Sequence, residues 1–138
     1  MKFTLRPARS DDAPATSRIL RELGYRVDER ELRVGLHRAC EAEDAQVIAV
    51  TEGDELVGLA ALSLAPGVGR LQALIVSEPR RNQGAGRILL AAAEAVASAN
   101  GCSELEAPAA LPEGRRFLRS AGFDGAAGRL VKPLGQLV

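Results

Sequence analysis

A glycine-rich segment in the middle of the chain has the residue types and spacing that suit the binding of a phosphate group. An apolar run at residues 71–76 leads into a turn that contains Gly84 and Gly86, and an Ala- and Leu-rich stretch follows. If that stretch is a helix, its first N–H groups have no partner within the helix and lie at the positive end of its dipole. Glycines there would let the backbone approach a pyrophosphate closely. Three cations flank the turn: Arg80, Arg81 and Arg87.

Two well-known phosphate loops do not fit this turn. A P-loop requires Gly-Lys followed by Ser or Thr, and the dipeptide Gly-Lys does not occur in the chain. The dinucleotide fingerprint requires a third Gly or Ala where this chain has Leu89, and it opens a parallel β-α-β unit, whereas this turn follows a predicted hairpin. The remaining alternative is a strand-to-helix turn whose glycines serve only the backbone angles.

A few other side chains could move protons in a reaction. Tyr25, the only tyrosine, follows the first predicted helix and could enter a cleft, although a half-buried packing role is the simpler interpretation. Glu78, Glu104 and Glu106 are candidate bases or water organisers, and a surface carboxylate is the default for each. His37 is expected to be a solvated helix residue.

Structural metal and disulfide bonds are not expected in this chain. Cys40 and Cys102 are isolated thiols without CxxC spacing, and His37 is the only histidine. These residues cannot assemble a zinc site of four nearby Cys or His ligands.

The periodicity of apolar residues places these motifs on alternating strands and helices. We expect strands at residues 3–5, 46–50, 56–64, 71–76, 103–107 and 129–134. Two helices precede the second strand: one is introduced by Ser10, Asp11 and Asp12 and ends at Gly24, and the next begins at Asp28 with Glu31 in capping-box spacing. Further helices are expected at residues 84–100 and 112–121. A tight turn at residues 51–54 and a loop at 65–70 join the central strands.

The predicted order, β-α-α-β-β-β-α-β-α-β, indicates an α+β fold with helices on the faces of one sheet. With 138 residues the chain has the length of one domain, which we take as residues 1–138. Internal repeats and linkers are not evident.

Composition and charge exclude several classes of protein. Apolar residues make up 46% and charged residues 26%, which is the globular range rather than the disordered one. Lys plus Arg and Asp plus Glu both number 18, so a general nucleic-acid-binding surface is not expected. The longest uncharged stretch, residues 56–69, is shorter than the roughly 20 residues of a membrane span. Charges near the N-terminus leave no secretory signal, and the protein is predicted to be cytoplasmic.

The motif Arg81-Asn82-Gln83-Gly84-Ala85-Gly86 resembles the Arg/Gln-x-x-Gly-x-Gly/Ala motif of the GNAT superfamily of N-acetyltransferases, at the expected place between the fourth strand and the third helix. Other segments agree with the family along nearly the whole chain: residues 6–8 with 11–13, 56–58, 113–118 with 121–123, and 129–134. The resemblance implies a mixed, mostly antiparallel central sheet with helices on both faces.

The resemblance further implies that the protein binds acetyl-CoA as co-substrate, without a metal. The pantetheine would lie in a gap between the fourth and fifth strands, and the pyrophosphate would lie on the glycine turn. Carried over residue by residue, backbone groups of Leu74, Ile75 and Val76 would pair with the pantetheine amides. The pyrophosphate would be held by Arg81, Asn82, Gln83, Gly84, Ala85, Gly86 and Arg87.

The reaction implied is direct attack of an amine on the thioester in a ternary complex. A backbone N–H near Val76 could stabilise the oxyanion, and Tyr25 and Glu78 are the candidate acid and base. Many family members carry a tyrosine as general acid at the position of Leu118, and this chain departs from that pattern. A thiol with a pKa near 8.5 is a tolerable leaving group, so the departure would slow the chemistry rather than abolish it.

Two functional classes therefore stay open. The first is an N-acetyltransferase that acts on the primary amine of a small molecule or a peptide. The second is an acyl-CoA-binding module of the same fold with little or no catalysis. Neither class requires nucleic acid or a membrane as partner, and a homodimer is left open.

Overall fold

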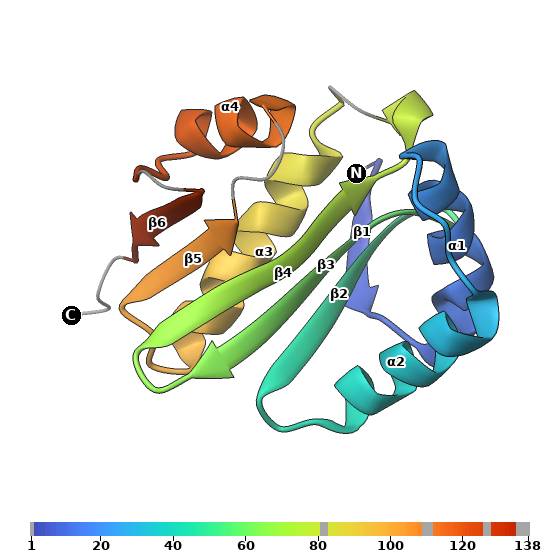
Figure 1. Cartoon of the computed structure of the whole chain (residues 1–138), viewed down its shortest axis with the longest axis horizontal. Helices are drawn as coiled ribbons and strands as arrows, with labels where there is room; N and C mark the ends of the chain where they lie inside the picture. Colours follow the sequence, from blue (N-terminus) through green and yellow to red (C-terminus); the bar gives the residue numbers. More distant parts are fainter. Residues whose placement is uncertain (1, 81–82, 109–111, 126–127, 135–138) are drawn as a thin grey trace.

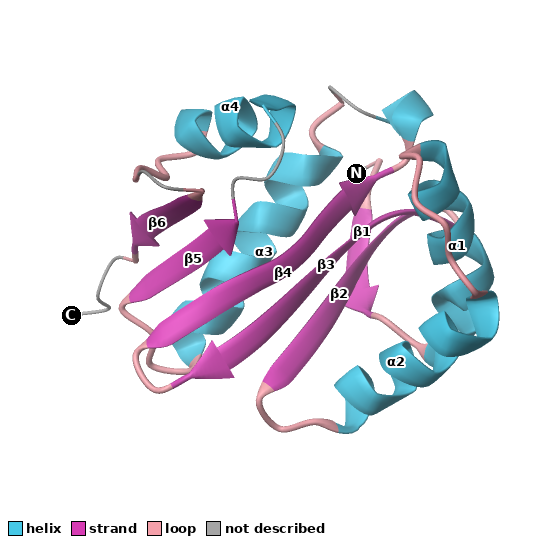
Figure 2. Ribbon diagram, viewed as in Figure 1, coloured by secondary structure: helices cyan, strands magenta, loops and turns pink. Residues whose placement is uncertain are grey.

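The computed structural model describes residues 2–80, 83–108, 112–125 and 128–134, which form a six-stranded sheet flanked by helices (Figures 1 and 2). The strands are β1 (Thr4–Pro7), β2 (Ala45–Glu52), β3 (Glu55–Ala65), β4 (Val68–Val76), β5 (Glu104–Pro108) and β6 (Arg129–Pro133). The helices are α1 (Ala13–Glu22), α2 (Glu29–Glu41), α3 (Ala85–Ala99) and α4 (Pro112–Ser120), with short 3-10 turns η1 (Ser10–Asp12) and η2 (Glu78–Arg80). The order along the chain is the predicted one, and the fold class is confirmed.

The strands lie in the sheet in the order in which they occur in the chain, β1-β2-β3-β4-β5-β6. Each neighbouring pair is antiparallel except β4 and β5, which are parallel because α3 carries the chain back to the other end of the sheet. The single parallel pair makes the sheet mixed, as the sequence resemblance implied.

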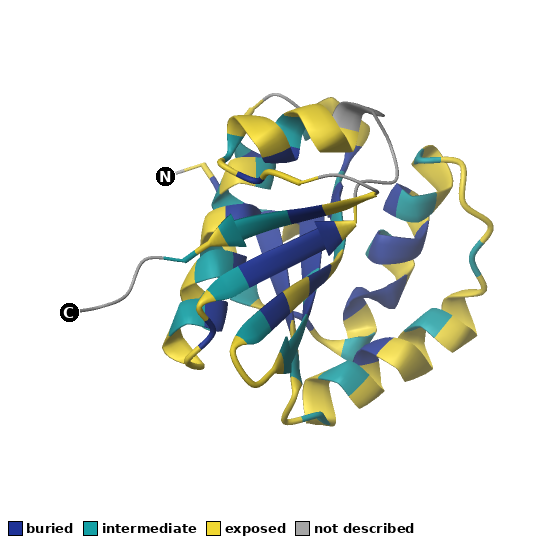
Figure 3. Cartoon of the chain, turned by 60° about the vertical axis from the view of Figure 1, so that its left-hand side comes forward, coloured by how far each residue is buried: buried dark blue, intermediate teal, exposed yellow. Residues whose placement is uncertain are grey.

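Helices cover the two faces of the sheet and divide the core in two (Figure 3). Along β2 the apolar side chains alternate: Ile48 and Val50 join the core beneath α3, whereas Val47 and Ala49 join the core beneath α1 and α2. This period of two is the pattern expected of a strand that is covered on both faces. None of the helices in the described part of the chain combines the length and the apolar composition that a bilayer span requires.

The connection between β3 and β4 is tighter than the sequence predicts. The expected loop at 65–70 is reduced to a two-residue turn at Pro66 and Gly67, and β4 begins at Val68 rather than Leu71. Proline followed by glycine is the pair favoured in a type II turn, and Gly67 has the required positive φ of 81°. The arginine at position 70, predicted to lie in a loop, is therefore part of β4.

The acids predicted to cap α1 act differently from expectation. Residues 10–12 form η1, and the Asp12 carboxylate accepts hydrogen bonds from the Arg6 guanidinium at 2.9 and 2.7 Å and from the N–H of Arg9 at 2.7 Å. Burial alone would raise the pKa of the Asp12 carboxyl, but these hydrogen bonds and the arginine charges lower it below its usual value. For α2 the predicted cap is confirmed, since Asp28 accepts from the N–H groups of Arg30 and Glu31.

Candidate functional site

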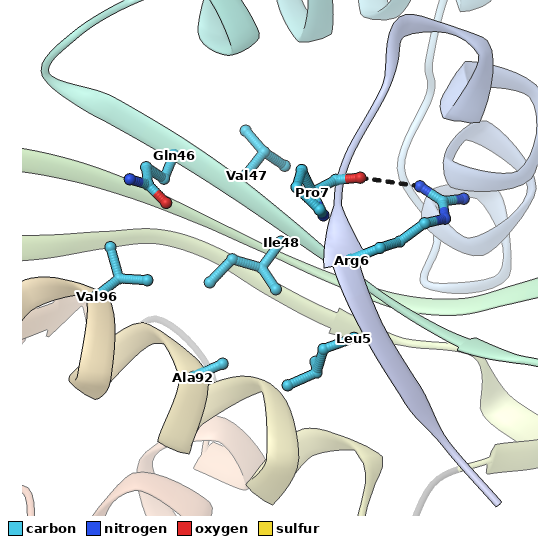
Figure 4. Close-up of a pocket in the computed structure, with 8 residues that line it drawn as sticks. All are labelled: Leu5, Arg6, Pro7, Gln46, Val47, Ile48, Ala92 and Val96. Atoms are coloured by element: carbon cyan, nitrogen blue, oxygen red, sulfur yellow. Dashed lines mark hydrogen bonds between the residues drawn. The ribbon is translucent and has the colours of Figure 1, made fainter.

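One pocket of about 250 Å³ lies at the β1 edge of the sheet, but its lining carries little chemistry (Figure 4). The wall is mostly apolar and is built by Leu5, Arg6, Pro7, Gln46, Val47, Ile48, Ala92 and Val96. Its one charged residue is Arg6, whose guanidinium donates to the carbonyl oxygen of Pro7 at 3.0 Å and pairs with Asp12. The residues with reactive or ligand-binding groups lie away from this pocket, around the C-terminal end of β4.

β4 pairs with β3 along its whole length but with β5 only over its first three residues. Its pairing with β3 extends from Val68 to Val76. Its parallel pairing with β5 covers only Val68, Gly69 and Arg70. Beyond Arg70 the two strands diverge (Figure 1), and we call the space between them the β4–β5 opening.

An irregularity in β4 lies close to the point of divergence. Leu71 pairs with Leu62 and Ala73 pairs with Ala61, so Gln72 is an extra residue with no partner of its own in β3. A bulge of this kind bends the strand and increases its twist. The extra residue comes two positions after Arg70, so the bulge lies close to the place where the parallel pairing with β5 ends.

The backbone of Leu74 and Val76 is directed toward the β4–β5 opening. The N–H of Ser77 donates to the carbonyl oxygen of Val57 at 2.8 Å, which sets the phase of the antiparallel ladder. By alternation, the backbone groups of Ile75 point to β3 and those of Leu74 and Val76 point to the opposite side. An extended ligand with amide groups could therefore pair with this side of β4 as a further strand would.

The glycine turn forms the start of α3, at the end of the sheet where β4 finishes (Figure 1). Gly84 caps the helix in the left-handed region with φ of 95°, a conformation that a side chain would strain. The first helical hydrogen bond runs from the N–H of Ile88 to the carbonyl oxygen of Gly84 at 3.1 Å. The N–H groups of Ala85, Gly86 and Arg87 precede it, at the positive end of the helix.

Gly86 is the residue of this turn that the fold itself does not require. No positive φ is found there, and a Cβ would meet Phe117 at 3.5 Å and Val76 at 3.8 Å, which are ordinary van der Waals distances. Alanine would favour the helix by about 1 kcal/mol relative to glycine. A methyl group would therefore fit between Phe117 of α4 and Val76 of β4, and we call this methyl-sized space the slot.

The cations around the turn divide into two groups. Arg87 is exposed, stacks over the Phe117 ring at 5.8 Å and donates to the Ser120 hydroxyl at 3.4 Å. Arg80 instead pairs with Glu52 at 2.7 Å, away from the turn. Lys2 donates to the Gln83 side chain and lies 3.5 Å from Glu52. Two predicted phosphate ligands, Arg81 and Asn82, lie outside the described residues.

The greater part of the chain matches a known protein family. Residues 12–123 match the model of the Acetyltransferase (GNAT) family. The chain belongs to the GNAT acetyltransferase family. A search of curated proteins found no significant match.

Solved GNAT structures share the fold over nearly the whole chain at low sequence identity. Ard1 from Thermoplasma volcanium is similar with a TM-score of 0.83 and 19% identity, over 99% of this chain and 100% of that one. The paia N-acetyltransferase of Thermoplasma acidophilum in complex with coenzyme A gives 0.81 and 18%, over 96% and 99%. The yncA protein of Salmonella typhimurium with its cofactor acetyl-CoA gives 0.81 and 16%, over 100% and 97%. At such identities the likeness establishes the fold alone.

The three residues predicted to act in GNAT catalysis lie near the end of β4 or in the loop after α1. Val76 is the last residue of β4. Glu78 is exposed at the start of η2, where its N–H donates to the carboxylate of Glu22 at 3.2 Å. Tyr25 follows three residues after Glu22 and is 55% exposed, so the half-buried packing role does not apply. The Glu22 contact joins the end of α1 to the end of β4.

Glu106 and Leu118 are both buried, although Glu106 was predicted to be a surface carboxylate. The surface default fails for Glu106, which is 5% exposed on β5 and pairs with Arg70 and Arg129. Leu118 is also 5% exposed and belongs to the core beneath α3, whereas its neighbour Phe117 lines the slot. His37 is exposed on α2, as predicted.

For four residues near the candidate site, the sequence did not predict a role there: Glu22, Arg70, Phe117 and Arg129. Arg70 was predicted to lie in a loop at residues 65–70. The Pro66-Gly67 pair is the sequence feature that could have indicated a shorter turn and placed Arg70 in the strand. The roles of Glu22 and Arg129 depend on contacts between distant segments, which no local pattern records.

Proposed function

We propose that the protein transfers an acetyl group from acetyl-CoA to the primary amine of a small molecule or peptide, by direct attack in a ternary complex. The observation that carries this proposal is Gly86. Its missing side chain keeps a slot between Phe117 and Val76 that the packing of the fold does not require. A ligand that extends from the start of α3 to the β4–β5 opening would pass this slot.

The two ends of the slot suit the two parts of CoA. The N–H groups of Ala85, Gly86 and Arg87 would hold the pyrophosphate at the helix N-terminus, with the Arg87 guanidinium beside it. By the sequence motif, Arg81, Asn82, Gln83 and Gly84 would complete this cradle. The pantetheine would then extend along the β4 residues Leu74 and Val76, whose backbone is directed toward the opening. The backbone groups of Ile75 face β3, so Ile75 would not form a hydrogen bond with the pantetheine but would hold Leu74 and Val76 in the strand.

The chemistry needs a deprotonated amine, a stabilised oxyanion and a thiolate that can leave. A backbone N–H near Val76, on the side of β4 that faces the opening, would supply the oxyanion interaction. Glu78 or its neighbour Glu22 would accept the proton of the ammonium group, directly or through water, and Tyr25 would protonate the thiolate from the end of α1. Each of these groups is exposed and accessible to an incoming amine.

One observation favours a second function. Leu118 is a buried apolar residue at the position where the resemblance expects a tyrosine acid. A chain without that acid could bind acyl-CoA and act as a binding module with little catalysis. The two functions share the CoA site and differ in turnover.

Thiol release from acetyl-CoA, measured against a panel of small amines and peptides, tests the proposal. Release that depends on both the amine and the enzyme supports acetyl transfer. A melting-temperature shift with CoA is measured in parallel, because a ligand at 100 times its Kd adds about 2.7 kcal/mol of stability. A shift without turnover supports the binding module, and no shift with millimolar CoA contradicts both functions.

A further inference from the structure

A buried carboxylate with two arginine partners lies beside the β4–β5 opening. Glu106 of β5 accepts from the Nε of Arg70 through Oε2 at 2.9 Å and pairs with the Nη2 of Arg129 through Oε1 at 2.5 Å. The Glu106 side chain is almost fully buried, whereas each arginine side chain is 63% exposed. The three residues join β4, β5 and β6 into one cluster, which we call the Arg–Glu–Arg cluster.

The Arg–Glu–Arg cluster lies on the face of the sheet that carries α1 and α2. Gly69, just before Arg70, packs against Ala97 of α3, so the next residue of the strand points to the opposite face. On that face α1 and α2 pack mainly against β2, β3 and β4. Figures 1 and 3 show this half of the sheet without a covering helix.

The cluster also marks the inner end of the β4–β5 opening. Arg70 and Glu106 form the last pair of the parallel ladder, and Arg129, which pairs with Pro108, lies toward the open end. If the pyrophosphate binds at the start of α3, the thiol end of CoA points along β4 toward this place. An acceptor that approaches the thioester from the uncovered face would meet the two arginines.

The charges of the cluster suit a ligand with one negative charge. Two guanidinium groups and one carboxylate leave a single positive charge, and Glu104, partly buried on the same face, lies one row farther from the opening. A guanidinium has five N–H donors, of which Glu106 uses few, and its planar fork matches a carboxylate. The buried carboxylate of Glu106 needs a cationic partner, and the two arginines that supply it keep most of their guanidinium surface exposed to a ligand.

We propose that the acceptor amine carries a carboxylate group, which Arg70 and Arg129 bind while Glu106 holds the two guanidinium groups in place. This inference rests on the proposed acetyl transfer and specifies its substrate class. The arginines are specificity-determining residues, and Glu106 is a positioning residue.

The test compares acceptors that differ only in the carboxylate. Glycyl dipeptides and their C-terminal amides keep the same amine, and kcat/KM is measured for both with wild type, Arg70→Gln and Arg129→Gln. We expect the acid to exceed the amide by about tenfold in wild type, the size of a lost hydrogen bond to a charged group. Each variant should lose about tenfold with the acid and less than about twofold with the amide. Arg33→Gln, at an exposed arginine of α2, is the matched control and should change neither.

Other outcomes separate the possible failures. Equal losses for acid and amide, or no preference in wild type, would overturn the inference while leaving acetyl transfer intact. Arg70→Lys keeps the positive charge but lacks the planar guanidinium group. If Arg70→Gln does not fold, Arg70→Lys replaces it in the comparison of acid and amide.

If no amine is acetylated, the proposed function fails and binding decides the inference separately. Calorimetric titration of the CoA-saturated protein with an N-acetylglycyl dipeptide and its amide then tests the site. Binding of the acid alone, lost in Arg70→Gln and Arg129→Gln, supports the carboxylate site, and equal or absent binding contradicts it.

Discussion

Glycines have two different roles in this molecule: packing requires some of them within the sheet, whereas Gly86 at the candidate site is not required by packing. Within the sheet, a Cβ on Gly69 would lie 2.9 Å from the Cβ of Ala97 on α3, and a Cβ on Gly58 would lie 2.9 Å from the carbonyl oxygen of Ile75. These distances are shorter than real Cβ contacts, so packing dictates glycine at both positions. At Gly86 the nearest atom is 3.5 Å away, and packing dictates nothing.

The difference shows which sequence features belong to the fold and which to a ligand. A glycine that packing requires says only that a helix and a strand are close. A glycine that packing permits to be alanine, at a helix start where alanine is about 1 kcal/mol better, indicates space that is kept for another molecule. The same substitution in the two regions should therefore have opposite consequences.

The largest effect is expected for Gly69→Val, which places a branched side chain against Ala97 and Leu105. The Ala97 methyl group is fixed to the helix backbone and the Leu105 side chain is fully buried, so the free energy of unfolding should fall by about 3 kcal/mol, as in overpacked cores. Urea denaturation measures this loss. The folded fraction should bind CoA with unchanged affinity, because Gly69 is at the far end of β4 from the glycine turn. A large loss of CoA affinity in folded Gly69→Val would remove the distinction between the two regions.

The matching substitution in the slot is Gly86→Val. The valine side chain would fill the space between Phe117 and Val76, and the affinity for CoA should fall by about 30-fold, which corresponds to about 2 kcal/mol. The free energy of unfolding should change by less than about 1 kcal/mol, because valine is no worse than glycine in a helix.

Gly86→Ala is the graded control for this prediction. The alanine methyl group fits at ordinary contact distance, so the variant should be slightly more stable than wild type and bind CoA with an intermediate affinity. Titration calorimetry with CoA measures both variants. Wild-type affinity in both would show that the slot is not part of the CoA site.

Leu118→Tyr tests a residue at the boundary of the two regions, because Leu118 is buried in the core while Phe117 lines the slot. If the position serves the reaction, the phenol should reach the thioester and raise kcat by about tenfold, below the usual range for general acids. The added hydroxyl should also lower stability by roughly 1 to 2 kcal/mol, since it enters a packed core.

Tyr25→Phe is the control for Leu118→Tyr. If Tyr25 already protonates the thiolate, this change lowers kcat and the introduced phenol adds nothing. A folded Leu118→Tyr that binds CoA without a gain in kcat, in a protein whose Tyr25→Phe variant is unimpaired, would assign position 118 to the scaffold alone.

The fold could be predicted from the sequence because its elements depend on local patterns. Alternating apolar residues in β2 and the Asp28 cap of α2 are properties of a few neighbouring residues, and both are found as expected. The start of β4 was mistaken because the Pro66-Gly67 turn is shorter than the loop expected from composition. The η1 turn was not predicted because the Asp12 side chain binds Arg6, six residues earlier, instead of capping α1.

The candidate site was predictable only where a motif occurs within one segment. The glycine turn is such a motif, and its position before α3 follows from the strand and helix around it. The Arg–Glu–Arg cluster requires residues from three strands, and the bulge at Gln72 becomes visible only in the pairing of β3 with β4. Burial of Glu106 and Leu118 likewise depends on tertiary packing, which single-residue defaults do not record.

The smallest expected effect distinguishes two arginines that flank the turn equally in sequence. Arg87 is exposed and stacked on Phe117 beside the helix start, so Arg87→Gln should lower CoA affinity by about fivefold, as expected for one partly screened charge near a phosphate. The loss should shrink as salt concentration rises. Arg80 pairs with Glu52 at 2.7 Å and belongs to the scaffold, so Arg80→Gln should cost at most about 1 kcal/mol of stability and leave CoA affinity within about twofold. CoA titrations of both variants at low and high salt measure the contrast. Equal losses of affinity would show that Arg80 also interacts with the phosphates, and η2 would then belong to the CoA site rather than to the scaffold.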